Sequence, residues 1–260
     1  MDAIADITEA LQKHHLATTF GWQDILQRYR RSRVGAFWLT INMGVMIGAL
    51  GVIFGALLRS PMQQFLPYIC AGLIVWGFIS SSLSDGCNSL ISAEGMILQV
   101  KMPLFTHVMR NIWRNIIIFF HNIIIFPFVV VAVAAPVSWT ILLGIPGFVL
   151  ICLNLLWMML ILGIICARFR DMNQVVQNLL QVLFYVTPLM WMPQNLPSSS
   201  LLYIIDWNPF FHLIQLVRAP LLGSAPTELN WIIAIGMLFV GWIAAIYIFG
   251  RFRNRIAYWL

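Results

Sequence analysis

Long, nearly uncharged apolar runs are the feature of this sequence that most restricts its fold. Several of them exceed the roughly 18–20 residues that an α-helix needs to cross a hydrocarbon core of about 30 Å. Only 9% of the 260 residues are charged and 61% are hydrophobic, whereas about a quarter of the residues in a soluble domain are charged. The chain lacks the polar surface of a water-soluble protein, so we predict an all-α polytopic membrane protein.

Six apolar runs are long enough to span a bilayer, and we predict a transmembrane helix in each. They lie at about residues 34–58, 65–83, 112–134, 139–167, 175–192 and 231–250. The segment 193–230 differs, because it contains five prolines and its apolar pieces are too short to cross. Such pieces favour re-entrant or interfacial half-helices at the outer surface.

The first 33 residues are polar enough to stay outside the hydrocarbon core, yet they keep helical periodicity. The apolar positions are Ile4, Ile7 and Leu11, followed by Trp22, Ile25, Leu26 and Tyr29. The opposite face of the second set carries Asp24, Gln27, Arg28 and Arg31. Such an amphipathic helix lies flat in the headgroup zone; the alternative is a solvated helix packed on a partner. We therefore divide the chain into an interface region (1–33), a transmembrane domain (34–250) and a C-terminal tail (251–260).

Basic residues lie almost entirely on one side of this predicted topology. The flanks on the side of the two termini carry Lys13, Arg28, Arg30, Arg31, Arg33, Lys101, Arg110, Arg114, Arg168, Arg170, Arg251, Arg253 and Arg255. The opposite flanks carry only Arg59 and Arg218. Because cytoplasmic flanks of membrane proteins are enriched in Lys and Arg, we predict cytoplasmic termini and an outward-facing 193–230 segment.

The sequence has no residues arranged to bind a nucleotide. Its two lysines, Lys13 and Lys101, are not part of a Gly-Lys-Ser/Thr triplet, so no P-loop exists. If this protein uses ATP, another chain must bind it. The four cysteines form no CxxC pair, and neither a metal site nor a disulfide framework is indicated. Since there is little solvated chain to carry a basic surface, nucleic acid is not an expected partner.

Amide side chains form a stripe along the fifth predicted span. Gln174, Gln177, Gln181 and Tyr185 follow one another at steps of three or four residues, which places them on one helix face. If they faced lipid, their donors and acceptors would have no partners. Two interpretations stay open: the stripe lines a polar path, or it makes ordinary packing contacts. Neutral amides and an aromatic ring suit a polar, uncharged cargo such as sugar better than a proton or a metal ion.

A second polar stripe lies at the start of the third predicted span. It comprises Asn111, Arg114, Asn115, His121 and Asn122. An arginine at the centre of a span costs about 2.5–3.5 kcal/mol on insertion scales, so we expect Arg114 near the cytoplasmic end, snorkelling or paired. Hydrogen bonding between helices and a substrate path are both consistent with this stripe.

Several short motifs, in order along the chain, resemble a known family. Residues 28–38 read RYRRSRVGAFW, residues 167–171 read ARFRD, and residues 255–260 read RIAYWL. Between them lie Thr187-Pro188, Asn208-Pro209 and Arg218. Together these motifs resemble the type-2 ABC-transporter permeases that export cell-surface polysaccharides. The similarity covers nearly the whole chain, with one departure: Met43 follows Asn42 where many members have proline.

This resemblance implies a homodimer with two copies of a separate ATP-binding cassette subunit, which would hold ATP and Mg²⁺. Members of the family move lipid-linked O-antigen, capsular polysaccharide or teichoic acid across the bacterial inner membrane. By the same resemblance, the N-terminal helix and a coupling helix at 92–103 would contact the ATPase. The contact residues would be Arg28, Tyr29, Glu94, Gln99, Lys101 and Pro103. The segment 193–222 would form outward gate helices, with Asn208, Pro209 and Arg218 at the gate.

The expected function is that of a permease subunit for lipid-linked polysaccharide, with O-antigen as the first choice. It would have no catalytic residues, metal or cofactor of its own. One alternative is a drug or small-lipid exporter of the same type, and another is a membrane scaffold without a transport role. A third is a membrane-embedded glycosyl or acyl transferase, which would need acid–base residues near the interface. The candidates for that role, Asp85, Asp171, Asp206, His107 and His212, form no recognisable constellation.

Overall fold

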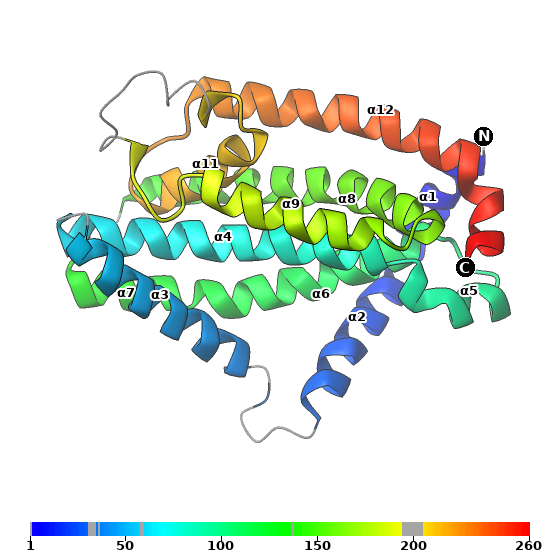
Figure 1. The fold of residues 1–260 in the computed structure, drawn as a ribbon, viewed down its shortest axis with the longest axis horizontal. Helices are drawn as coiled ribbons and strands as arrows, with labels where there is room; N and C mark the ends of the chain where they lie inside the picture. Colours follow the sequence, from blue (N-terminus) through cyan, green and yellow to red (C-terminus); the bar gives the residue numbers. More distant parts are fainter. Residues whose placement is uncertain (1, 31–34, 36, 58–59, 137, 194–204) are drawn as a thin grey trace.

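The long helices of this protein run side by side in one elongated bundle (Figure 1). The structure is a computed structural model that describes residues 2–30, 35, 37–57, 60–136, 138–193 and 205–260. Every regular element within these ranges is helical. The prediction of an all-α membrane protein is confirmed at this level.

Five helical stretches are long and apolar enough to cross a membrane. They are α3 (Phe37–Leu57), α4 (Met62–Asn88), α6 and α7 together (Phe105–Val133), η2 and α8 together (Trp139–Arg168) and α12 (Glu228–Trp259). Within them, α6 covers Phe105–Ile123, α7 covers Ile125–Val133, the 3₁₀ turn η2 covers Trp139–Leu143, and α8 covers Gly144–Arg168. Each stretch overlaps one of the apolar runs in the sequence.

The fifth apolar run, 175–192, forms a shorter helix than expected. α9 (Met172–Val186) has 15 residues, which corresponds to about 22 Å at 1.5 Å per residue. The hydrocarbon core is about 30 Å thick. The helix stops before Pro188, because the residue preceding a proline avoids the helical region, and Thr187 is extended with ψ of 131°. A count of six spans is therefore not reached among the described residues.

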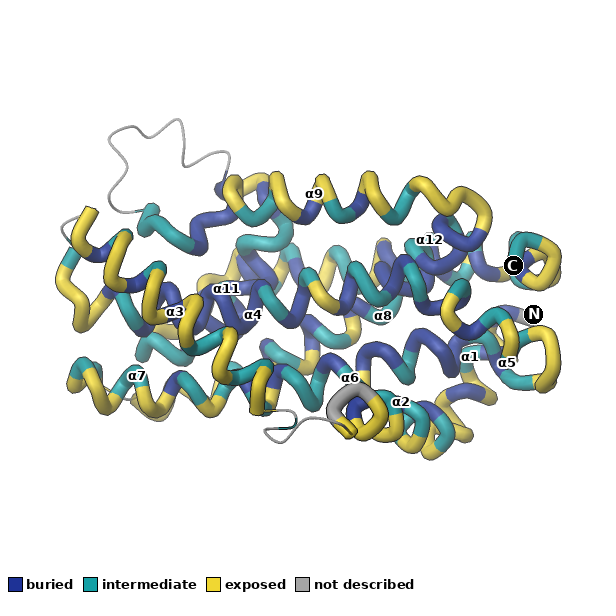
Figure 2. Tube along the Cα trace, turned by 60° about the horizontal axis from the view of Figure 1, so that its bottom comes forward, coloured by how far each residue is buried: buried dark blue, intermediate teal, exposed yellow. Residues whose placement is uncertain are grey.

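α4 forms the centre of the bundle. In its apolar window 78% of the residues are buried, against 11% in α3 and 22% in α12 (Figure 2). α3, α6, α8, α9 and α11 (Pro209–Leu221) all pack against it. Gly86 allows a close approach to α8, since a Cβ at this position would lie 2.9 Å from the Cα of Met159. The core is thus organised around α4, and the outer helices present apolar side chains away from it.

Both chain termini lie at one end of the bundle, together with α5 (Glu94–Gln99), and α7 and α11 lie at the opposite end (Figure 1). α11 has 13 residues, too few to cross. It packs back onto α4, α8 and α12 and buries most of its side chains. The remainder of the expected gate segment, 194–204, lies outside the described residues, as do 31–34 and 36 of the first motif.

The N-terminal region forms two helices, α1 (Asp2–Gln12) and α2 (His14–Tyr29). The face of α1 that packs on the bundle consists of Ala3, Asp6 and Ala10. Ile4 and Leu11, two of the three expected apolar positions, are instead more than half exposed. Small residues take the inner positions because they let α1 approach α12 closely.

α2 turns part of its expected polar face toward α6. Trp22 and Leu26 are more than half exposed, and Ile25 is buried. Asp24, expected on the solvated face, points inward, because it finds arginine partners on α6. The assignment of Asp24 to a solvated face is therefore wrong, while the exposure of Trp22 and Leu26 is consistent with a headgroup position.

Candidate functional site

A polar groove of about 360 Å³ lies between α4 and α9. It is lined by Trp76, Ser80, Ser81, Ser84, Gln177, Leu180, Gln181 and Phe184. Hydroxyl, amide and aromatic groups make up most of this wall, and none of the lining side chains is charged. Such a surface hydrogen-bonds neutral polar groups and packs against a flat ring.

The serines of the groove come from the one face of α4 that keeps some exposure. Ser80 and Ser84 are half-buried and Ser81 is exposed, while most of α4 is buried. Sequence patterns do not single them out, because the apolar run ends near residue 83 and the polar stretch that begins at Ser84 is typical of a loop. α4 in fact continues to Asn88. The signal in the sequence is the four-residue spacing of Ser80 and Ser84, which places both on one helix face.

Two members of the amide stripe in α9, Gln177 and Gln181, line this groove. Gln177 Nε2 donates to Ser84 Oγ at 2.6 Å and so connects α9 to α4. Gln174 is exposed and donates to Asn178, and Tyr185 is exposed and outside the groove lining. The structure therefore brings half of the predicted stripe to the site, and its role as a path stays a prediction.

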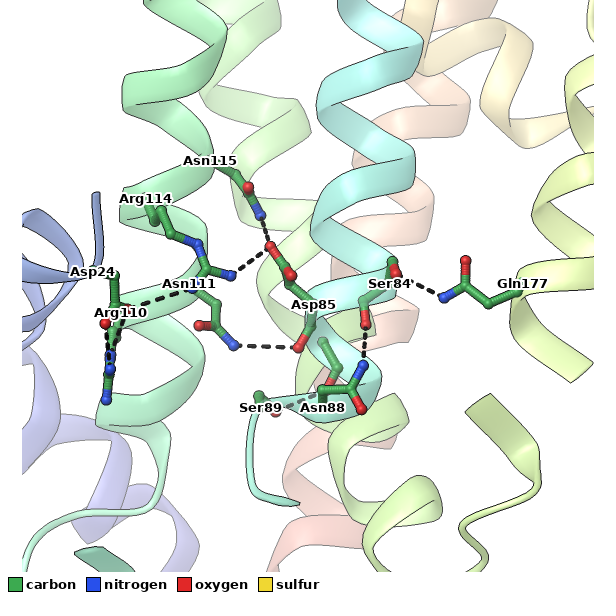
Figure 3. A network of polar contacts seen from close by, with 11 residues as sticks. Asp24, Ser84, Asp85, Asn88, Ser89, Arg110, Asn111, Arg114, Asn115 and Gln177 are labelled. Carbon is green, nitrogen blue, oxygen red and sulfur yellow. Dashed lines mark hydrogen bonds and ion pairs between the residues drawn. The ribbon is translucent and has the colours of Figure 1, made fainter. Parts of the chain in front are cut away.

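Charged side chains behind the groove join α2 to α6 and α6 to α4 (Figure 3). Arg110 pairs with Asp24 through both nitrogens of one edge: its Nε donates to Asp24 Oδ2 at 2.7 Å, and its Nη2 donates to Oδ1. Arg114 lies between two carboxylates. Its Nη2 is 2.7 Å from Asp85 Oδ2, and its Nη1 is 3.4 Å from Asp24 Oδ2. Arg114 is thus paired, one of the two arrangements expected for it.

Two asparagines of α6 also hold Asp85. Asn115 Nδ2 donates to Asp85 Oδ2 at 2.9 Å, and Asn111 Nδ2 donates to the Asp85 carbonyl at 3.2 Å. For these residues the second stripe makes hydrogen bonds between helices, as one of its two interpretations predicts. His121 instead bonds the carbonyl of Ile117 in its own helix. Asn122 lines a separate cavity of about 260 Å³ between α3, α4 and α6.

The expected ATPase-contact residues of the coupling segment lie at the end of the bundle that holds the termini. Glu94 and Gln99 are the first and last residues of α5. Gln99 and Lys101 are exposed, whereas Pro103 is buried. Arg28 and Tyr29 belong to the last turn of α2, and their side chains are not among those the structure describes. Contact with a partner through this surface stays a prediction.

Asp6 fixes the chain directly after this coupling segment, and sequence patterns gave no sign of it. Its carboxylate accepts from the backbone N–H groups of Leu104 and Phe105, at 3.2 and 3.1 Å, at the start of α6. Arg253 of α12 donates to the same carboxylate at 3.0 Å. Asp6 is 1% exposed. One buried carboxylate therefore ties α1, α6 and α12 together beside α5.

The predicted gate residues meet at the opposite end of the bundle. Asn208 Nδ2 donates to Thr187 Oγ1 at 2.8 Å, and Asn208 Oδ1 accepts from Phe210 N at the start of α11. Pro209 occupies the first position of α11, where its missing N–H costs nothing. Arg218 is fully buried and donates to the Pro188 carbonyl at 2.6 Å. The motif residues 187–188, 208–209 and 218, separate in sequence, form one cluster.

Two of the five candidate residues for a transferase, His212 and Asp85, are engaged in structural contacts. Both ring nitrogens of His212 have partners at 2.8 Å, namely Asn230 Oδ1 and the carbonyl of Asp206. The Asp85 carboxylate is held by Arg114 and Asn115. A general acid–base group has to reach a reacting atom, and these two side chains face other helices instead.

The apolar bundle and the uncharged groove between α4 and α9 are typical of the membrane subunit of a transporter. This class does not by itself fix the family. The chain belongs to the ABC-2 type transporter family, whose model matches residues 16–222. That match confirms the resemblance read from the motifs.

Named relatives within this family are export and transport proteins. The chain is 24% identical over 215 residues to the O-antigen export system permease protein RfbA of Myxococcus xanthus, covering 82% of each protein. It is 24% identical over 199 residues to the RfbA protein of Klebsiella pneumoniae, covering 74% of each. It is 23% identical over 238 residues to the polysialic acid transport protein KpsM of Escherichia coli, covering 84% of this chain and 88% of KpsM.

Proposed function

We propose that this chain is the permease subunit of an ATP-driven exporter that moves lipid-linked polysaccharide, with O-antigen as the first choice, across the bacterial inner membrane. The groove between α4 and α9 carries the proposal, because it is an uncharged hydroxyl- and amide-lined surface within an apolar bundle. The names of the relatives support the same class of cargo.

Sugar rings match the chemistry of this groove. A hexose has hydroxyls around its rim and C–H groups on its faces, so serines and glutamines bond the rim while an aromatic ring packs on a face. Trp76 and Phe184, with ring centroids 6.2 Å apart, supply that aromatic surface. Gln177 donates one hydrogen bond to Ser84 across the groove. Exchanging their bond for bonds to a sugar hydroxyl is therefore nearly neutral in free energy.

A second copy of the chain and two ATP-binding subunits complete the proposed transporter. The exposed side of α9 would face the second copy across a shared path, and residues 175–192, which include most of α9, would supply the fifth of the six predicted spans. The end that holds the termini and α5 would be cytoplasmic, in line with the arginine count. ATP and Mg²⁺ would bind to the partner subunits, which would contact α2 and α5. A Glu94→Lys substitution is then expected to uncouple ATP hydrolysis from export without affecting membrane insertion.

Reconstitution of the permease with its ATPase in liposomes tests the proposal. ATP-dependent transfer of lipid-linked O-antigen is measured by its protection from, or exposure to, an added glycosidase. The double variant Gln177→Leu with Gln181→Leu removes two amides from the groove and is expected to slow transfer about thirty-fold, since two lost hydrogen bonds of about 1 kcal/mol each raise the barrier by about 2 kcal/mol. Val240→Leu, at a 70% exposed position of α12 away from the groove, is the control.

Unchanged glycan flux in the double variant would show that the groove is not the path. A wild-type complex that moves small lipids but no glycan would instead favour the drug or small-lipid exporter.

A further inference from the structure

Arg114 is the only described side chain that makes ion pairs with carboxylates from two other helices. Asp24 belongs to α2, a helix of the N-terminal interface region, and Asp85 belongs to the central helix α4. The side chain of Arg114 is 13% exposed, that of Asp24 is 15% exposed and that of Asp85 is 30% exposed. Pairs this well screened from solvent hold their partners more firmly than surface pairs, because removing one charge leaves the other buried without compensation.

α2 is fixed on α6 by close packing as well as by charge. A Cβ at Gly21 would lie 2.9 Å from the carbonyl oxygen of Arg110 and 3.1 Å from Cδ1 of Trp113. The guanidinium of Arg110 also lies over the ring of Phe20, 5.7 Å from its centroid. A displacement of α2 therefore displaces the Arg110–Arg114 turn of α6 with it.

Asp85, the residue of α4 that pairs with Arg114, is directly connected to the groove, because its neighbour in sequence, Ser84, lines the groove. Ser84 and Asp85 are consecutive, so they point about 100° apart around the helix. Asp85 points to α6, where Arg114 and Asn115 hold it, and Ser84 points to α9, where it accepts from Gln177 (Figure 3). One turn further along, Asn88 accepts from Asn173 of α9 at 3.0 Å. Any rotation of α4 that moves Asp85 therefore also moves Ser84 and Asn88. The hydrogen bonds of these two residues hold α9 against α4 and so set the width of the groove.

We propose that Asp24, Arg114 and Asp85 form a relay that transmits a displacement of α2 to the groove between α4 and α9. The inference rests on the proposed function, because it assigns the coupling between the interface helix and the cargo path to these three positioning residues. None of them lines the groove. The relay works because α2, α6 and α4 are joined by charged pairs in series, so that α2 and α4 change position together.

The experiment compares Asp24→Asn and Asp85→Asn with the wild-type permease in complex with its ATPase. Each substitution keeps the side-chain shape and removes one charge. Both variants are expected to hydrolyse ATP at the wild-type rate. The amount of glycan exported per ATP is expected to fall at least about five-fold, because coupling between two sites typically changes affinity by that factor or more. Asp24→Glu, which keeps the charge, is expected to restore part of the loss. Glu9→Gln, which removes the exposed i, i+4 pair with Lys13, is the matched control and is expected to behave as wild type.

Hydrogen–deuterium exchange gives a readout that requires no cargo. A non-hydrolysable ATP analogue is expected to change exchange in both α2 and α9 of the wild type, and in α2 alone in Asp85→Asn. Equal responses of α9 in the wild type and Asp85→Asn would overturn the relay. The relay would also be overturned if export, ATP hydrolysis and the melting temperature of Asp24→Asn all fell together. That pattern would mean that the substitution only destabilises the protein. A wild-type complex that exports no glycan would refute the proposed function, while the exchange measurement would still decide on the relay.

Discussion

The guanidinium of Arg218 lies over the ring of Tyr68, 4.3 Å from its centroid. Both side chains donate to the carbonyl oxygen of Pro188, Arg218 at 2.6 Å and Tyr68 at 2.8 Å. Pro188 lies in the segment that follows α9, Tyr68 belongs to α4, and Arg218 belongs to α11. This contact therefore holds α11 and the segment directly after α9 against the central helix α4.

Substitution of Arg218 is expected to cost more stability than substitution of Tyr68. Arg218→Met removes a charged donor to the Pro188 carbonyl, and hydrogen bonds to charged groups contribute about 1.5–3 kcal/mol. Tyr68→Phe removes one neutral hydrogen bond, about 1 kcal/mol, and leaves the aromatic ring under the guanidinium. Thermal unfolding of the detergent-purified protein checks the order. Equal melting temperatures for Arg218→Met and wild type would contradict a structural role for this contact.

Substitution of Asp6 is expected to destabilise strongly the end of the bundle that holds the two termini. Asp6→Ala leaves Arg253 and two N–H groups of α6 without their acceptor, and breaking a buried pair by removing one partner costs about 3–5 kcal/mol. Limited proteolysis at 100–103 reports the local effect, and thermal unfolding reports the global one. Glu9→Gln, in a pair whose side chains are about half exposed, is expected to change stability by less than about 1 kcal/mol. Equal melting temperatures for Asp6→Ala and Glu9→Gln would contradict the role of Asp6 in holding α1, α6 and α12 together.

A methyl group at Gly21 is expected to push α2 away from α6. The added carbon would lie 2.9 and 3.1 Å from backbone and ring atoms that cannot easily retreat, and overpacking of this kind costs about 1–3 kcal/mol. Gly21→Ala should therefore weaken the pairing of Asp24 with Arg110 and lower export per ATP. Gly48→Ala, where no atom lies within 4 Å of the added methyl, is the control. Export at the wild-type level in Gly21→Ala would contradict tight docking of α2.

The topology predicts which substituted cysteines react from the same side of the membrane. Lys101→Cys follows α5, which lies at the end that holds the termini, and Arg168→Cys, the last residue of α8, is on the same side of the predicted topology. Trp207→Cys, at an 84% exposed position, comes just before α11, which lies at the opposite end. A membrane-impermeant maleimide added to intact spheroplasts is expected to label only Trp207→Cys. Labelling of either of the other two variants would contradict the cytoplasmic placement of the termini.

Sequence patterns predicted the helices better than they predicted the contacts between them. Apolar runs marked five membrane-length helices, because burial in lipid requires an uninterrupted run that is visible in one dimension. The run at 175–192 forms a helix only as far as Val186, since Thr187-Pro188 ends the helix while hydrophobicity continues, and a membrane span there stays a prediction. The order of the family motifs marked Asn208 and Arg218 as candidate site residues, and in the structure both contact the Thr187-Pro188 segment. The serines of α4 and the carboxylate of Asp6 were missed, because single polar residues gain meaning only from what another helix places beside them.

The sequence by itself determined that this is a membrane protein, that it is helical and that it contains no P-loop. It also determined that the basic residues gather on one side of the predicted topology. Each of these follows from composition and spacing along one chain. Only the tertiary structure decided that α4 is the central helix, that Asp24 turns inward, and that Arg114 lies between carboxylates of α2 and α4. Those facts depend on contacts between residues about 30 to 90 positions apart in the sequence, and hydrophobic periodicity carries no information about which helix faces which.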